Sequence, residues 1–143
     1  MNWNIELGSK WRLGDCIDLD VLDRQATEEF NEGGRSSYKN TWRGLAAERI
    51  LIENCGYRND TRKYKDVYNP ENVSTEVKTF HEKVKQGPDE YMREILDTLL
   101  DRKKWASISE YVIFFSRNDR EMEYTAHAMW EYDSRLRDYI EVA

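Results

Sequence analysis

The segment Val73-Ser74-Thr75-Glu76-Val77-Lys78-Thr79-Phe80 decides how this chain folds. It is rich in β-branched and aromatic residues, and it therefore predicts a strand. Successive side chains of a strand face opposite sides of a sheet, so Glu76 and Lys78 should point together while Val77 packs on the other face. A carboxylate beside an ammonium group at a strand end can hold a metal ion and a water molecule next to a phosphate.

The sequence on both sides of this segment predicts further helices and strands. Thr41 is a suitable helix cap and Gly56 a suitable helix stop, and Pro88 fits the first turn of a later helix. Polar turn residues at 69–72 should join two strands as a hairpin. The expected elements are a helix at 41–55, strands at 57–68 and 73–80, a helix at 87–104, and strands at 108–116 and 122–132.

The two ends of the chain are less regular. Gly33 and Gly34 end an acidic N-terminal segment, residues 1–34, in which 15–20 fits a short strand and 21–31 fits a helix. Residues 134–142 fit a short C-terminal helix. In the strand expected at 122–132, strict alternation places Tyr124, Ala126 and Ala128 on one face.

This order of elements predicts an α/β protein in which a mixed central sheet is flanked by helices. The length of 143 residues suits a single domain, 1–143, whose main core spans 41–132. No apolar run is long enough to cross a membrane, and the N-terminus lacks the layout of a signal peptide. Cys16 and Cys55 lack metal-ligand spacing and are expected to be reduced thiols. These features favour a cytoplasmic protein that has no membrane partner.

The charge distribution bears on possible partners. The formal net charge of −6 argues against a dedicated, tight nucleic-acid binder, because phosphates are neutralised by clustered Lys and Arg. Residues 35–104 nevertheless carry fifteen basic and twelve acidic groups, whereas residues 1–34 carry three basic and eight acidic groups. The positive excess falls on the segment that contains Glu76 and Lys78, although an ordinary mixed surface explains the same numbers.

Hydrolysis of a phosphodiester requires charge neutralisation and an activated water, and divalent metal ions supply both. Mg²⁺ prefers oxygen ligands, which the carboxylates of Asp66 and Glu76 and the carbonyl of Val77 can provide. Lys78 can then orient the water or stabilise negative charge on the phosphate. Glu48 lies in the apolar stripe of the helix expected at 41–55 and can reach the same region.

Several runs of the chain together resemble one nuclease superfamily. They are Arg43-Gly44-Leu45-Ala46-Ala47-Glu48, Cys55-Gly56-Tyr57, Lys65-Asp66 and Thr75-Glu76-Val77-Lys78-Thr79. Across residues 41–116 the chain resembles the PD-(D/E)XK superfamily, which includes restriction enzymes, junction resolvases and phage nucleases. It departs from the motif at Lys65, which stands where the motif has proline.

This resemblance implies a restriction-endonuclease-like αβββαβ core and Mg²⁺- or Mn²⁺-dependent endonuclease cleavage of DNA. It also implies that Asp66 and Glu76 bind metal, that Lys78 is the catalytic lysine, and that Glu48 is the helix carboxylate. By resemblance, a phage or a defence system is the expected setting. A domain this small has little surface for reading a DNA sequence, which favours a homodimer or a larger nuclease assembly.

Other interpretations of the same residues stay open. Glu76 and Lys78 also fit a solvated cross-strand charge face, and His81 fits an exposed polar residue. The basic residues that are candidates for phosphate contacts fit a solvated strand equally well; they are Arg58, Arg62, Lys63 and Lys65. The main alternative function is a binding protein that keeps a nuclease-like fold without the chemistry and acts through protein partners.

Overall fold

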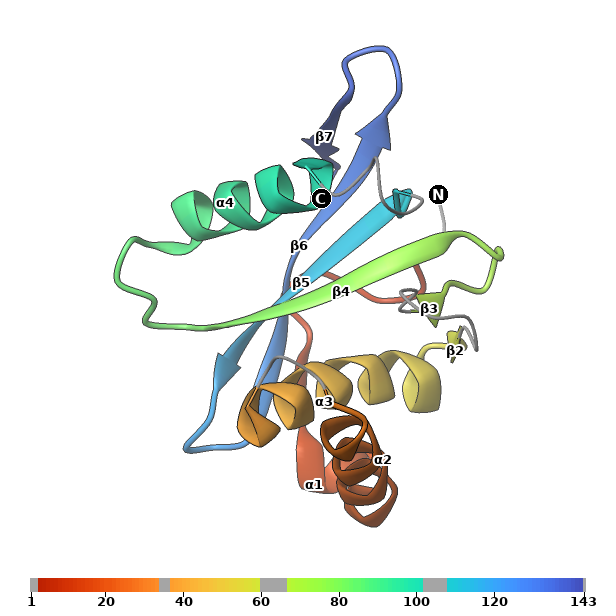
Figure 1. Ribbon diagram of the computed structural model, residues 1–143, viewed down its shortest axis with the longest axis vertical. Helices are drawn as coiled ribbons and strands as arrows, with labels where there is room; N and C mark the ends of the chain where they lie inside the picture. Colours follow the sequence, from red (N-terminus) through yellow and green to blue (C-terminus); the bar gives the residue numbers. More distant parts are fainter. Residues whose placement is uncertain (1–2, 34–36, 60–66, 102–107, 143) are drawn as a thin grey trace.

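The computed structural model describes residues 3–33, 37–59, 67–101 and 108–142 (Figure 1). These residues form a seven-stranded sheet with the strand order β1-β6-β5-β4-β3-β2, and β7 also pairs with β6. The strands are β1 (Lys10–Arg12), β2 (Arg58–Asn59), β3 (Val67–Tyr68), β4 (Ser74–His81), β5 (Tyr111–Asn118), β6 (Glu123–Asp133) and β7 (Asp138–Glu141). The helices are α1 (Leu13–Cys16), α2 (Leu19–Asn31), α3 (Tyr38–Asn54) and α4 (Pro88–Asp101).

The sheet is mixed, as predicted, because one of its strand pairs is parallel. Strands β4 and β5 run in the same direction, and every other paired strand is antiparallel to its neighbour. Parallel neighbours require a long crossover connection, and α4 supplies it. The expectation of an α/β protein with a mixed sheet and flanking helices is therefore confirmed.

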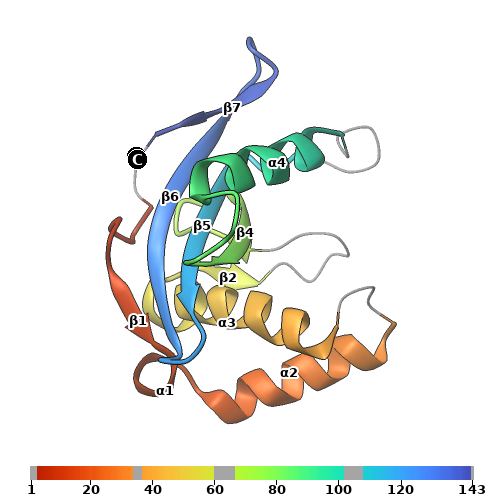
Figure 2. The same ribbon diagram turned by 90° about the vertical axis from the view of Figure 1, so that its left-hand side faces the viewer.

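Helices cover both faces of the sheet (Figures 1 and 2). Alternate side chains of β5 divide between two groups of buried residues, since Ile113 and Phe115 face α3 whereas Val112 and Phe114 face α4. We call these groups the α3 core and the α4 core. Helices α1 and α2 contribute to the α3 core through Leu13, Leu22 and Ala26. This division explains why the centre of β5 is apolar on both faces.

Helix α3 begins one turn earlier than predicted. Ser37, not Thr41, caps it, because the Ser37 hydroxyl accepts a hydrogen bond from the backbone N–H of Asn40 at 3.2 Å. Its buried face carries Leu45, Ala46, Ala47, Ile50 and Leu51. The helix ends at Asn54, with Cys55 as its C-cap, and Gly56 follows with a φ of +77°, a value that glycine adopts readily.

The predicted hairpin ahead of β4 is present. Strand β3 pairs antiparallel with the start of β4, and Asn69 fixes the turn between them. The Asn69 side-chain oxygen accepts hydrogen bonds from the backbone N–H groups of Glu71 and Val73 at 3.0 and 2.8 Å. Of the strand predicted at 57–68, the structure describes β2 and β3, and residues 60–66 lie outside the described residues.

Strand β6 breaks the strict alternation predicted for it. Phe114 of β5 pairs with Ala128 and Phe115 pairs with Ala126, so His127 is an extra residue that forms a bulge. As a result, Ala126 joins the α3 core and Ala128 joins the α4 core. The His127 ring lies edge-on to Phe80, with the ring centroids 5.0 Å apart.

The predictions for the two chain ends are partly wrong. Residues 134–142 form no helix, because Asp133 sets a turn and the chain returns as β7 beside β6. The Asp133 carboxylate accepts from the backbone N–H groups of Arg135 and Leu136, and Arg137 has a φ of +53°. Residues 15–20 form no strand either; β1 lies earlier, at Lys10–Arg12, and α1 follows it directly. The helix predicted at 21–31 is confirmed as α2.

None of the helices in the described part of the chain combines the length and the apolar character that a membrane span requires.

The two leucines at positions 96 and 136 provide a matched test of this fold. Leu96 is fully buried in the α4 core, whereas Leu136 at the β6–β7 turn is 65% exposed. We expect Leu96→Ala to lower the free energy of unfolding by about 2–5 kcal/mol, since it leaves a cavity. Leu136→Ala should change it by less than about 0.5 kcal/mol. Urea denaturation of the three proteins measures both values, and equal losses would contradict the assignment of α4 to the core.

Candidate functional site

Strand β4 positions the first two candidate residues. Val77 is buried in the α3 core and Phe80 in the α4 core, so Glu76 and Lys78 alternate onto the face that carries Phe80. Lys78 Nζ lies 2.9 Å from Glu76 Oε1, and their side chains are 33% and 14% exposed. The predicted shared face is therefore present, and it holds a partly buried ion pair.

Helix α3 brings a third candidate, Glu48, within electrostatic reach of this pair. Its side chain keeps some exposure but is surrounded mostly by protein, and burial is the main cause that raises its pKa from 4.5 to about 8. The charges of Glu29 and Glu76 raise the pKa of Glu48 further, whereas Lys78 opposes the shift. The structure thus places Glu48 where an added positive charge would relieve repulsion between carboxylates.

Glu29 of α2 was not predicted as part of this site. Burial, together with the charge of Glu32, raises the pKa of Glu29, whose own charge acts on Glu48. In the sequence Glu29 is one of several acids in a helical segment, beside Glu28 and Asp23. The packing of α2 beside α3 is what directs one of them toward Glu48, and no local pattern encodes that packing (Figure 2).

The fourth candidate, Asp66, lies outside the described residues. Its described neighbour in the chain, Val67, pairs with Thr75, which directly precedes Glu76. Within the residues that the structure describes, no group of three or more His, Cys, Asp or Glu side chains could hold a metal ion. Asp66 is not among the side chains to which that statement applies.

Of the four residues predicted to contact nucleic acid, the structure describes one. Arg62, Lys63 and Lys65 lie outside the described residues. Arg58 is described; its guanidinium lies 4.6 Å from the centroid of the Tyr68 ring and donates a hydrogen bond to the side chain of Asn72. Arg58 therefore has a structural role in holding β2 against the hairpin turn, and its role toward nucleic acid stays a prediction.

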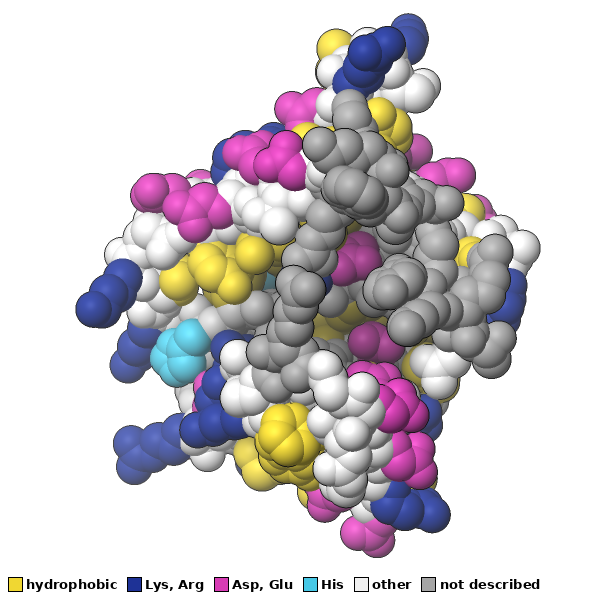
Figure 3. All heavy atoms as spheres, viewed as in Figure 1, with side chains coloured by type: hydrophobic (Ala, Val, Ile, Leu, Met, Phe, Trp, Pro, Cys, Tyr) yellow, Lys and Arg dark blue, Asp and Glu magenta, His cyan; other side chains and the backbone are white. Residues whose placement is uncertain are grey.

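Glu48, Glu76 and Lys78 together make the described part of this site rich in carboxylate oxygens beside one ammonium group. Figure 3 shows acidic side chains in the hollow between α4 and α3. Carboxylates at Glu48 and Glu76 are the donors that hard divalent cations prefer, and Lys78 supplies hydrogen-bond donors for an anionic oxygen. Comparisons with protein-family models, curated proteins and solved structures find no match to this chain. Its activity is therefore inferred from its own side chains.

The raised pKa of Glu48 predicts how stability depends on pH. The folded protein favours protonated Glu48 more strongly than the unfolded chain does. The stability that this preference contributes is therefore complete below about pH 4.5 and is lost as the pH rises to about 8. We expect Glu48→Gln to remove this dependence and to be more stable than the wild type at pH 8 by roughly 1–3 kcal/mol. Urea denaturation at a series of pH values from 5 to 8 measures the difference.

A matched control is Glu141→Gln at the exposed end of β7. This variant should keep the pH dependence of the wild type. If the wild type and Glu48→Gln show parallel stability curves across this range, Glu48 is not held in the environment described above.

Proposed function

We propose that this protein is an endonuclease that hydrolyses phosphodiester bonds in DNA with Mg²⁺ or Mn²⁺. The observation that supports this most is the Glu76–Lys78 pair on β4, 2.9 Å apart, with the Glu48 carboxylate of α3 in electrostatic contact with it. This combination places acidic oxygen donors beside a cation, which suits a phosphate held between a metal ion and a lysine.

The order of elements gives independent support. From α3 to β5 the chain runs helix, three strands, helix, strand, and β4 is parallel to β5. This is the αβββαβ order of the restriction-endonuclease-like core that the PD-(D/E)XK resemblance implies. In this proposal, α3 is the first helix of the core and β4 is the strand that carries its Glu-x-Lys motif.

The donor set fits a hard divalent cation. Burial, and then the charges of Glu29 and Glu76, raise the pKa of Glu48, so a cation between Glu48 and Glu76 would relieve the repulsion between these two carboxylates. When bound, Mg²⁺ or Mn²⁺ would neutralise the phosphate and lower the pKa of a coordinated water. Asp66 would be a third carboxylate. It directly precedes Val67 in the sequence, and Val67 pairs with Thr75, the residue before Glu76. The Val77 carbonyl is the further ligand proposed.

The protein's own side chains would divide the remaining work. Lys78 would donate hydrogen bonds to the attacking water or to a phosphate oxygen, so that developing negative charge is stabilised. Its pairing with Glu76 would hold the ammonium on the correct side of β4. The buried side chain of Val77 between them fixes the strand in the α3 core, which keeps the spacing of the two charged groups constant.

Cleavage assays test this function directly. With Mg²⁺ or Mn²⁺ we expect the wild type to cut at least one of three substrates: supercoiled plasmid, a branched junction or single-stranded DNA. Lys78→Met, Glu76→Gln and Asp66→Asn should each lower the rate by about 100-fold or more, because each would remove a group that stabilises the transition state. Lys10→Gln is a matched control, since Lys10 lies on β1 with an exposed side chain and should leave the rate unchanged.

Two outcomes would overturn the proposal. Cutting that survives both Lys78→Met and Glu76→Gln would place any activity elsewhere. If no substrate is cut although the protein is folded, the non-catalytic binding protein becomes the better interpretation. A Mn²⁺ titration then adds a second readout, because the nuclease proposal requires that Glu76→Gln weaken metal binding.

A further inference from the structure

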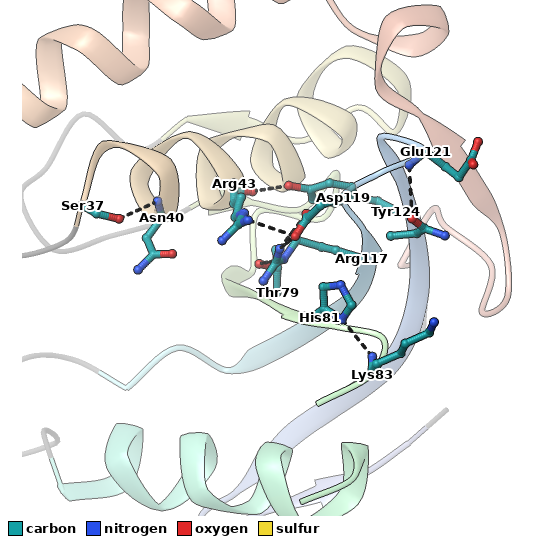
Figure 4. Close-up of polar contacts among 11 residues, drawn as sticks. Ser37, Asn40, Arg43, Thr79, His81, Lys83, Arg117, Asp119, Glu121 and Tyr124 are labelled. Atoms are coloured by element: carbon teal, nitrogen blue, oxygen red, sulfur yellow. Dashed lines mark hydrogen bonds and ion pairs between the residues drawn. The ribbon is translucent and has the colours of Figure 1, made fainter. Parts of the chain in front are cut away.

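Beyond the candidate site, Lys, Arg and His side chains gather where β4 and β5 end. His81 is the last residue of β4 and pairs with Arg117 of β5, and Lys83 follows two residues later. The first turns of α3 bring Arg43 to the same place (Figure 4), and Lys39 lines a pocket together with Arg43 and Asp119. We call these five Lys, Arg and His residues the basic end. Ligands of α/β proteins often bind at the carboxyl ends of parallel strands, which is where this group lies.

Two arginines of the basic end share one carboxylate. Asp119 accepts from Arg117 Nη1 at 2.7 and 2.6 Å and lies 3.0 Å from Arg43 Nη2. Arg117 Nε also donates to Thr79 Oγ1 at 3.0 Å, and Arg117 is only 9% exposed. Two guanidinium groups against one carboxylate leave one positive charge in excess within this partly buried cluster. Such a charge is stabilised by an anion, because desolvated charges require partners.

A shallow pocket of about 130 Å³ opens beside this cluster. Lys39 and Arg43 provide its positive charge, and the aromatic rings of Trp42 and Tyr124 are part of its wall. Both rings are held in place, since Trp42 Nε1 donates to Asp23 at 2.8 Å and the Tyr124 hydroxyl donates to the Arg43 carbonyl at 2.9 Å. The pocket therefore combines two cationic donors, beside the Asp119 carboxylate, with a largely apolar wall in which Trp42 is the half-buried aromatic side chain, and this suits a phosphate attached to a sugar.

The basic end and the candidate site share two elements, β4 and α3. His81 is three residues beyond Lys78 on β4, which corresponds to about 10 Å along an extended strand, and it alternates onto the face that carries Val77 and α3. Arg43 lies five residues before Glu48, which corresponds to about 7.5 Å along the axis of α3. A nucleic-acid strand carries one phosphate for each nucleotide, so a strand whose phosphate lies at the candidate site has further phosphates close enough to meet the basic end.

We propose that the basic end binds the sugar-phosphate backbone of a nucleic-acid strand, close to the phosphate held at Glu76 and Lys78. This inference rests on the proposed nuclease function, because that function defines the strand being held. It assigns backbone contacts to residues other than Arg58, Arg62, Lys63 and Lys65. Figure 3 shows Lys and Arg side chains beside a histidine on the left-hand side of the molecule.

The test removes two positive charges without leaving Asp119 unpaired. In Lys39→Gln/Arg43→Gln, Arg117 still binds Asp119 through two hydrogen bonds, so the protein should fold as the wild type does. The matched control is Lys10→Gln/Arg12→Gln, which loses two exposed cations from β1, each 3.9 Å from its acidic partner. Urea denaturation should give all three proteins similar free energies of unfolding.

Binding of fluorescein-labelled single-stranded and duplex DNA is measured without divalent metal, between about 50 and 200 mM salt, so that cleavage cannot interfere. We expect Lys39→Gln/Arg43→Gln to bind about 10-fold more weakly and to lower the slope of log K against log salt by about 2, one for each lost phosphate contact. The control should stay within about twofold of the wild type. Equal binding by the two double variants, or no binding by the wild type, would overturn the inference.

Two further measurements separate this inference from the proposed function and from simple anion binding. If the wild type never cuts but the basic-end variant still loses affinity, the backbone contact stands and the nuclease proposal fails. If inorganic phosphate stabilises the wild type and not Lys39→Gln/Arg43→Gln, yet both bind DNA equally, the pocket is a free-anion site and the inference fails.

Discussion

Strands β4 and β5 pair in parallel from Thr75 and Tyr111 to His81 and Arg117. A tight turn cannot join parallel neighbours, so the chain must leave the end of β4, cross one face of the sheet as α4, and return at the start of β5. The opposite face is then left for α3. This single pairing therefore sets which helix covers which face, and it brings the ends of both strands to the same side of the molecule. The charged groups of both proposals are attached to this framework.

The charges on β4 are costly for a central strand. Glu76 is only 14% exposed, and its desolvation is offset by Lys78 at 2.9 Å. Two apolar residues at these positions would suit the surrounding core better, and Glu48 adds a second carboxylate to the same region. Local arrangements that disfavour folding are expected where side chains serve binding or chemistry. The same reasoning applies to Arg43 and Arg117, because these two cations share the single negative charge of Asp119.

Local periodicity predicted the central elements well. The apolar run at 111–115 and the alternation at 73–80 appear in the structure as β5 and β4, and Glu76 and Lys78 share a face because alternation depends only on neighbouring residues. The failures have a different origin. The bulge at His127 depends on the pairing register with β5, and β7 depends on a turn that Asp133 and the left-handed backbone of Arg137 create. Glu29 and the Arg43–Asp119–Arg117 cluster join residues from separate elements, so no local pattern contains them.

The bulge at His127 also affects how cooperatively the protein unfolds. Before it, the apolar row of β6 belongs to the α3 core; after it, Ala128 belongs to the α4 core, and β5 contributes alternate side chains to both. Strands β5 and β6 therefore contribute buried side chains to both the α3 core and the α4 core. Loss of packing in one core destabilises these strands and with them the other core. Two groups of helices that would otherwise melt separately are thereby joined into one cooperative unit, and partially unfolded forms with a single intact layer should be scarce.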